Sequence, residues 1–375
     1  MARRDVSAAG RRDRSLSTPD AAGLDRVASR YARKPAVSEL AIRVEQRASG
    51  FTWAYGDTTR AYFVASITKL FTTALIMQLR QEKALTLDTP AADIVGARVM
   101  SGLSVHGGRD YGPEVTIREL LSHTSGIPDH YDQKLPGGRT LLDEARAGDR
   151  DWSFDDLIER TRQMPSPGFA PSTPGRAVYS DTNFQLLGRI IESVASRSYA
   201  EELQSRIIEP LALHDTWLFT SHNLDRYDEA APVMLGQERL RIPRMLASGP
   251  SDGGVVSTAD DQVRFLRAFV SGRLFPPPYL NEMASRWNSI FSPVDPLSYG
   301  MGIMRLRLPR WQSPLNPVPE MIGHSGSLGT VLYHIPQRDI FIAATVNQMK
   351  PRSLVHRLII QLVAASRSRT TAARS

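Results

Sequence analysis

Apolar and polar positions along the chain follow two kinds of pattern, one typical of strands and one typical of helices. Residues 40–55 contain two β-prone runs around a turn at 48–50, which indicates a hairpin. Residues 328–347 contain two further runs around 336–339 and predict a second hairpin. From residue 351 onward apolar residues recur at helical spacing, so we expect a helix to follow the second hairpin.

Four segments between the two hairpins carry the helical period: residues 116–122, 153–163, 181–195 and 259–270. The simplest assembly is an α+β fold in which one α/β lobe contains both hairpins and a mostly helical lobe is inserted into it. The predicted α/β lobe comprises residues 21–80 and 250–365, and the helical lobe residues 81–249. Residues 1–20 and 366–375 are then a basic disordered arm and a basic tail.

One apolar segment, "YFVASITKLFTTALIMQL" at residues 62–79, has no continuous polar face and therefore predicts a buried helix. It nevertheless carries Ser66 and Lys69, which i, i+3 spacing places on one face near the helix start. An amine in apolar surroundings is pushed towards its neutral form and can take a serine proton. The backbone N–H of Ser66 could also stabilise an oxyanion. Because Ser-x-x-Lys arises readily by chance, this motif needs support elsewhere in the chain.

Composition narrows the chemistry. The 375 residues include no cysteine, which excludes thiol nucleophiles, disulfides and cysteine-ligated zinc. The formal charge is +7, but most of the excess lies in the terminal segments, so a nucleic-acid partner is not expected. No apolar stretch of export-signal length follows Arg3 and Arg4, and no apolar run is long enough to cross a bilayer. The expectation is a cytoplasmic protein without a membrane partner.

Two later segments supply further candidate groups. Tyr179 immediately precedes the predicted helix at 181–195, where the positive helix end should favour its phenolate and allow proton exchange with a serine or a leaving group. His324, Ser325 and Gly326 come just before the strand predicted at 328–335. Small residues there would let a substrate backbone lie close. The amide of Ser327 could donate into an oxyanion hole.

Taken in order, these groups resemble the motifs of the serine β-lactamase and penicillin-binding-protein superfamily, especially its branch of class C β-lactamases, D-alanyl-D-alanine carboxypeptidases and esterases. That family shows Ser-x-x-Lys, then Tyr-x-Asn, then Lys-Thr-Gly or His-x-Gly. Here the motifs stand at residues 66–69, 179–181 and 324–326. Family-like stretches also occur at 115–128, 210–218 and 251–269, so the resemblance covers roughly residues 25–365.

The resemblance implies a β-lactamase/transpeptidase-like antiparallel sheet flanked by helices, and a site that requires no metal or organic cofactor. By similarity, Ser66 attacks an acyl carbonyl, and Lys69 and Tyr179 share the proton transfers. The amides of Ser66 and Ser327 hold the oxyanion. Substrate binding falls to a set of residues from the second and third motifs, namely Asp181, His324, Ser325 and Gly326. His123, in the stretch at 115–128, is assigned a structural role.

Two positions depart from the family pattern. Asp181 stands where the family usually has Asn, which replaces an amide donor by an acceptor. His324 replaces the Lys of the β-lactamase triplet, so a cation for a β-lactam carboxylate is missing unless this histidine is protonated. Both changes argue against a dedicated β-lactamase.

The expected function is a serine-dependent acyl-enzyme catalyst that cleaves a small-molecule ester or amide. The acyl group then passes to water, or to an amine or alcohol, with secondary metabolism as one setting for such a transfer. The sequence leaves the choice of acceptor open. The alternatives are D-Ala-D-Ala carboxypeptidase or β-lactamase activity, and a sensor that is acylated once without turnover.

Overall fold

The computed structural model describes residues 17–290, 295–309 and 317–367. Most of the predicted arm at 1–20 and tail at 366–375 therefore lies outside the described residues.

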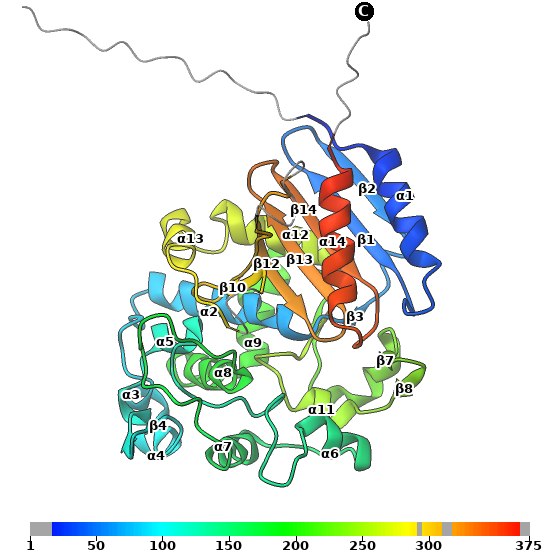
Figure 1. Cartoon of the computed structure of the whole chain (residues 1–375). Helices are drawn as coiled ribbons and strands as arrows, with labels where there is room; N and C mark the ends of the chain where they lie inside the picture. The colour runs from blue at the N-terminus through cyan, green and yellow to red at the C-terminus, as the bar shows by residue number, and fades with distance from the viewer. Residues whose placement is uncertain (1–16, 291–294, 310–316, 368–375) are drawn as a thin grey trace, which may run out of the picture.

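An antiparallel sheet of seven strands forms the frame of the fold, in the order β10-β11-β12-β13-β14-β1-β2 (Figure 1). Its strands are β1 (Ala41–Gln46), β2 (Phe51–Tyr55), β10 (Leu297–Tyr299), β11 (Met304–Leu306), β12 (Met321–Gly326), β13 (Thr330–Ile335) and β14 (Ile340–Thr345). Both predicted hairpins are confirmed, as β1 with β2 and β13 with β14. The two hairpins belong to one sheet because β1 pairs with β14, with Ala41 opposite Thr345.

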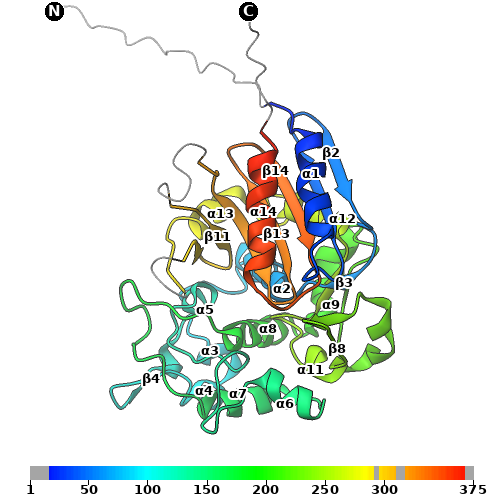
Figure 2. The same ribbon diagram turned by 45° about the vertical axis from the view of Figure 1, so that its right-hand side comes forward.

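Helices cover the central strands on both faces. Helices α1 (Ala21–Ala32) and α14 (Ser353–Ala365) pack side by side on one face, and α12 (Ala259–Ser271) packs against β14 and β1 (Figure 2). All six residues of β14 are buried, which explains why its sequence is apolar without alternation. The predicted helix after the second hairpin is confirmed as α14.

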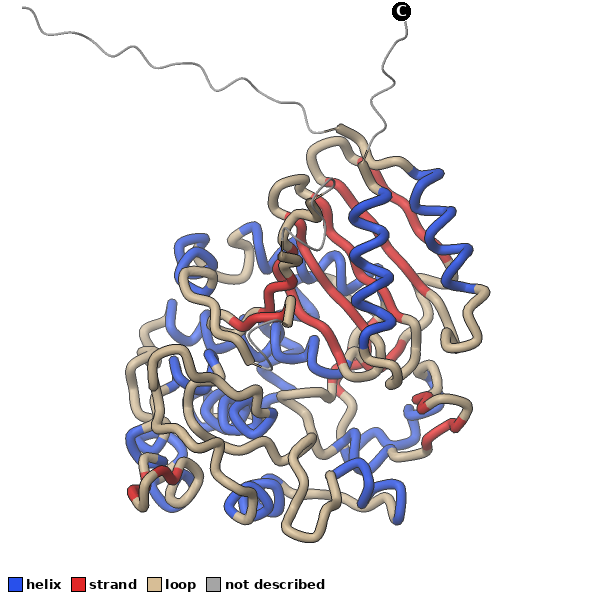
Figure 3. Tube along the Cα trace, viewed as in Figure 1, coloured by secondary structure: helices blue, strands red, loops and turns tan. Residues whose placement is uncertain are grey.

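Most of the remaining helices gather below the sheet (Figure 3). Three of the four predicted helical segments lie here, as α5 (Ile117–Ser122), α7 (Phe154–Arg162) and α8 (Asp181–Ala195), and the fourth is α12. The other helices are α3 (Ala92–Val95), α4 (Ala97–Met100), α6 (Leu141–Ala147), α9 (Tyr199–Leu203), α10 (Glu209–Leu211), α11 (Pro243–Ala247) and α13 (Pro277–Met283), with short 3-10 or π segments η2 (Gly112–Glu114), η3 (Gln204–Ile208) and η4 (Ser221–Glu229). Short strand pairs are β4 (Val105–His106) with β5 (Arg109–Asp110), and β7 (Val233–Leu235) with β8 (Glu238–Leu240).

The apolar segment at 62–79 is a helix only in part. Tyr62 and Phe63 form strand β3, which pairs with β9 (Val255–Ser257), and β9 also pairs with β6 (Trp217–Leu218). A 3-10 turn, η1 (Ala65–Ile67), then leads into α2 (Thr68–Gln81). The predicted helix is thus wrong at its first three residues, because the aromatic side chains of Tyr62 and Phe63 suit a strand with a partner beside it, and Val64 connects that strand to η1.

The predicted α+β class, with an antiparallel sheet flanked by helices, is confirmed. The boundaries proposed for the two lobes stay a prediction. Over the described ranges, no helix combines the length and apolarity needed to cross a bilayer.

Candidate active site

Ser66 lies in the 3-10 turn η1, directly before α2. Ala65, the preceding residue, has a φ of 51°, a left-handed conformation that costs free energy for any residue with a side chain. Its surroundings hold it there: the Thr330 hydroxyl donates to the Val64 carbonyl at 2.8 Å, and a Cβ on Gly326 would lie only 3.0 Å from the Ala65 Cβ. The sheet therefore sets the position of the serine through β12 and β13.

Lys69, one turn further on, is completely buried. Its ammonium forms an ion pair with the carboxylate of Asp181 at the start of α8, and donates to the backbone carbonyl of Asp252 at 2.8 Å. The same nitrogen lies 5.2 Å from the centre of the Tyr179 ring. The structure thus brings Lys69 together with Tyr179 and Asp181, which stand more than 100 positions further along the sequence.

The charge state of Lys69 differs from the expectation. Desolvation by burial lowers the pKa of Lys69, as expected, but the carboxylates of Asp181 and Asp252 outweigh it, and the pKa is raised above the ordinary value. The resting amine is therefore an ammonium, and the expectation of a neutral amine is wrong. The substitution of Asp for the family's Asn at position 181 supplies the largest of the opposing charges.

Tyr179 also differs from the expectation of a phenolate. Burial raises the pKa of Tyr179 well above its ordinary value, the Asp181 carboxylate raises it further, and a hydrogen bond with the Ser66 hydroxyl opposes both only in part. The helix-end effect is therefore outweighed by desolvation and by neighbouring negative charge. Tyr179 rests as a neutral phenol that contacts the candidate nucleophile.

A buried histidine supports this tyrosine. His123 caps the end of α5 and accepts the backbone N–H of Ser180 on Nδ1 at 3.1 Å. Its ring lies 4.5 Å from the ring of Tyr179, and burial lowers its pKa well below the ordinary range. A neutral imidazole that holds the backbone next to Tyr179 has the structural role predicted for it.

Two further carboxyl groups, absent from the sequence prediction, lie beside Asp181. Asp129 accepts the backbone N–H of Asp181 at 2.9 Å, and Asp252 accepts the Gln185 side-chain amide at 2.8 Å. Burial, together with the charge of Asp181, raises the pKa of Asp129 to about 7 and that of Asp252 well above its usual range. Asp252 stands in the family-like stretch at 251–269, which was the one signal that could have pointed to it.

The third motif forms strand β12 rather than the turn before a strand. His324 is completely buried; its Nε2 hydrogen-bonds the Tyr299 hydroxyl at 3.0 Å and its Nδ1 the Ser325 carbonyl at 2.8 Å. Burial, reinforced by the charge of Lys69, lowers the pKa of His324 to about 3. The ring is therefore neutral and does not line either cavity at Ser66, so it is not placed to contact a substrate there.

Ser325, Gly326 and Ser327 lie along the cleft in front of Ser66. Ser327 lines both cavities, and its side chain hydrogen-bonds the Tyr131 phenol. The assignment of the N–H groups of Ser66 and Ser327 to the oxyanion hole stays a prediction.

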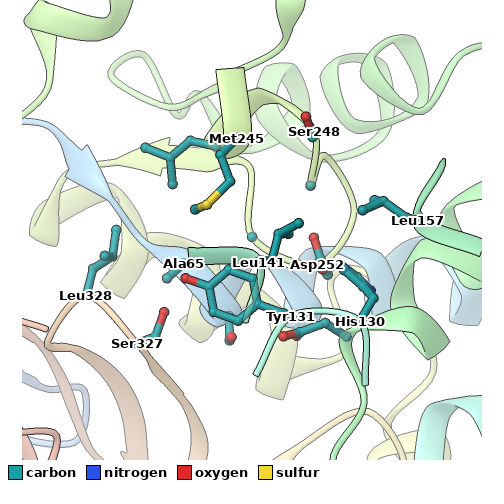
Figure 4. A pocket seen from close by; sticks show the side chains of 15 residues that line it. Ala65, His130, Tyr131, Leu141, Leu157, Met245, Ser248, Asp252, Ser327 and Leu328 are labelled. Atoms are coloured by element: carbon teal, nitrogen blue, oxygen red, sulfur yellow. Dashed lines mark ion pairs between the residues drawn. The ribbon is translucent and has the colours of Figure 1, made fainter. Parts of the chain in front are cut away.

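Two cavities meet at Ser66. The smaller, of about 60 Å³, is lined by leucine and methionine side chains and by the polar side chains of Asp181, Asp252 and His130. Figure 4 shows the Tyr131 ring within it, with Ser327 and Leu328 towards one end and Leu157 and Asp252 towards the other. The larger, of about 470 Å³, opens between β12 and α14 and is also lined by Tyr179 and Asp181. A substrate carbonyl at Ser66 could thus extend into two differently shaped spaces.

Within the described part of the chain, no group of three or more histidine or acidic side chains has an arrangement that could hold a metal ion.

The family model named Beta-lactamase matches residues 37–365. Penicillin-binding protein 4 of Amycolatopsis lactamdurans is 32% identical over 251 residues, covering 64% of this chain and 57% of that protein. The chain therefore spans little more than half the length of this curated relative.

Two solved structures share the fold over nearly their full length. A D-stereospecific amidohydrolase from Streptomyces sp. superposes with a TM-score of 0.71 at 25% identity, covering 90% of this chain and 98% of that one. The D-amino acid amidase from Ochrobactrum anthropi SV3 superposes with a TM-score of 0.74 at 20% identity, covering 92% and 99%.

Proposed function

Because this chain belongs to the Beta-lactamase family, we propose that it is a serine hydrolase that cleaves a small amide or ester through an acyl-enzyme on Ser66. One observation carries the proposal: Ser66 stands where two cavities meet. Its hydroxyl forms a hydrogen bond with the Tyr179 phenol, and the buried Lys69 lies one helical turn away. A nucleophile with two candidate proton carriers at the floor of a cleft fits acyl transfer.

In the proposed acylation, the Ser66 oxygen attacks the substrate carbonyl while its proton passes to Lys69 in the amine form. Lys69 first reaches that form by releasing its extra proton to solvent water, a release that the Asp181 carboxylate opposes. The N–H groups of Ser66 and Ser327 stabilise the oxyanion. Tyr179, a neutral phenol, donates its proton to the leaving group and recovers one from Lys69.

The proposed substrate follows from the two cavities. The smaller one suits a compact, mostly apolar acyl group, and its lining residues Asp181 and Asp252 fit an acyl group that also carries an amine. Similarity to a D-stereospecific amidohydrolase and to a D-amino acid amidase supports an amino acid amide as the first substrate to test. The buried, neutral His324 gives no cation for a β-lactam carboxylate, which places β-lactamase activity second.

The test is direct. We would offer D- and L-alaninamide, D-phenylalaninamide, p-nitrophenyl acetate and a chromogenic cephalosporin, and follow the mass of the Ser66 peptide during turnover. The proposal expects a transient acyl adduct on that peptide and none in Ser66→Ala. Wild-type protein that releases product without an adduct on Ser66 would overturn it. A stable adduct without turnover would instead favour the acyl-binding sensor.

The acyl acceptor belongs to this proposal as well. Water is the acceptor we favour, and adding amines and alcohols to the same reactions, with products identified by mass spectrometry, tests a transacylase. A cytoplasmic location, and action without a nucleic-acid partner, stay predictions that cell fractionation and a DNA-binding assay would check.

A further inference from the structure

A hydrogen-bonded pair in the larger cavity joins Ser325, predicted only to bind substrate, to His356, which was not predicted from the sequence. Nε2 of His356, on the first turn of α14, is 2.8 Å from the hydroxyl of Ser325 on β12. The Tyr333 phenol, on the neighbouring strand β13, reaches the same serine oxygen at 2.8 Å. Ser325 and His356 both line the cavity that Ser66 lines, whereas Tyr333 does not line it.

The single proton of Ser325 decides what this hydroxyl can do. A serine hydroxyl donates one hydrogen bond and accepts up to two. If the proton points to Nε2 of a neutral His356, the serine oxygen keeps a lone pair for a donor in the cavity. If His356 carries the proton, the serine hydroxyl is free to donate instead. His356 therefore controls whether Ser325 accepts or donates.

The surroundings favour the neutral imidazole. Burial lowers the pKa of His356, and the carboxylate of Asp295 opposes this only in part. The other charged groups along this cavity are Asp132, Asp181, Arg352 and Arg357. Of these, Arg352 forms a bidentate ion pair with Asp132 at 2.8 Å, and Asp181 forms the ion pair with Lys69. At neutral pH His356 is then a base, connected through one hydroxyl to the space in front of Ser66.

We propose that Ser325 and His356 form a proton relay that activates the acyl acceptor when it enters through the larger cavity. The inference rests on the proposed acyl-enzyme and concerns the second half-reaction, in which the acyl group leaves Ser66. Ser325 would contact the acceptor, and His356 is a positioning residue that acts through Ser325.

The proposed deacylation proceeds through a tetrahedral intermediate on Ser66. The acceptor oxygen forms a bond to the acyl carbon while its proton moves to Ser325 and the Ser325 proton moves to Nε2 of His356. The tetrahedral intermediate then breaks the bond to Ser66, whose oxygen takes the proton of Tyr179. The proton on His356 returns to Tyr179 through water in the cavity. The net change replaces the Ser66 ester by a free Ser66 hydroxyl and an acylated acceptor.

The experiment separates the two half-reactions. Acylation by p-nitrophenyl acetate releases nitrophenolate, a leaving group that needs no proton. Deacylation is followed as loss of the acetyl mass from isolated acetyl-enzyme. In His356→Gln, which keeps a hydrogen bond but cannot take a proton, we expect the ratio of deacylation to acylation rate to fall at least tenfold. The matched control is His214→Gln, because His214 is exposed and lines neither cavity.

A pH profile of deacylation distinguishes a proton relay from a purely structural role of His356. Wild-type deacylation should fall as the pH drops through a value below 6.5, where His356 becomes protonated, and His356→Gln should lack this acidic limb. Ser325→Ala should show the same loss as His356→Gln, and the double variant no more than either, because the two act in series.

Other outcomes overturn the relay in distinct ways. Equal deacylation in His356→Gln and His214→Gln, or additive losses in the double variant, excludes it. If His356→Gln does not fold, Ser325→Ala with an unchanged deacylation rate excludes it equally. If the wild type forms no acetyl-enzyme, the proposed function itself is refuted. If acylation is normal and deacylation is unaltered in the variants, only the relay is refuted.

Discussion

The Lys69 ammonium and the Asp181 carboxylate form an ion pair inside the protein, beneath the ring of Tyr179. Lys69 is completely buried, and Asp181 is nearly so. Charges in such a position are stable mainly because each has the other, so removing one changes the protonation of the remaining group more than it would at the surface. The pair thus stores the candidate base in its protonated form.

Asp181→Asn should move the pH dependence of acylation to lower pH. The variant removes the largest charge that holds the proton on Lys69, while the desolvation that disfavours the ammonium remains. The pKa of Lys69 must therefore fall, and the reactive amine becomes populated at lower pH. The burst rate with p-nitrophenyl acetate, measured across pH, checks this. Asp93→Asn, an exposed change on α3, serves as the control. An unshifted profile would mean that Lys69 is not the base.

Tyr179→Phe should slow acylation by amides about 10²- to 10⁴-fold, the range typical of a lost general acid. The ring contact with His123 survives in the variant, because only the hydroxyl is removed. With p-nitrophenyl acetate the loss should be smaller, since that leaving group needs no proton. Single-turnover rates for the two substrates provide the measurement. Equal losses for both would argue that the phenol positions Ser66 rather than supplying a proton.

Asp129→Asn should stabilise the protein increasingly as the pH rises from 4 to 7. The pKa of Asp129 is about 7 in the folded protein and ~3.9 in an unfolded chain. Between these values the native state binds more protons than the unfolded state, so native stability is lost as the pH rises. The variant removes that loss, up to about 4 kcal/mol as an order of magnitude.

Urea unfolding at several pH values measures this difference, with the exposed Asp225→Asn as the control. A pH-independent difference between Asp129→Asn and the wild type would show that Asp129 does not carry the proton.

Gly326→Ala should destabilise the protein and slow acylation together. A Cβ at this position would lie 2.4 Å from the Val64 carbonyl and 2.2 Å from the Thr330 hydroxyl, so the strand and the segment that presents Ser66 must separate. Gly148→Ala has open space around its Cβ and no positive φ, and should be nearly neutral. Thermal melting and burst rates compare the two. Acylation at the wild-type rate in Gly326→Ala would show that this contact does not position Ser66.

Patterns local in the sequence predicted much of this structure. Both hairpins, the four helical segments and the place of Ser66 one turn before Lys69 depend on neighbours within a few residues, which the sequence displays. Tyr179 was a candidate from its place before the helix at 181–195, and the resemblance to a known family supported it. Charge states could not be predicted in this way, because the pKa of Lys69 depends on Asp181 and Asp252, which approach it only in the folded chain. For the same reason the pair formed by Ser325 and His356 could not be expected from positions 31 residues apart.

The misplaced helix start has a similar explanation. Tyr62 and Phe63 are as apolar as the residues that follow them, and periodicity alone does not distinguish a short strand from a helix end. Their partner, β9, lies almost 200 residues further along the chain. Only that partner decides between the two structures.

The pairing of β1 with β14 also constrains how the protein is made. Ala41 meets Thr345, so during synthesis the N-terminal hairpin must wait for about 300 further residues before its partner strand leaves the ribosome. At typical elongation rates this lasts on the order of tens of seconds. Throughout that interval the apolar residues of β1 lack their native cover, and a nascent chain in this state is a natural client for a chaperone.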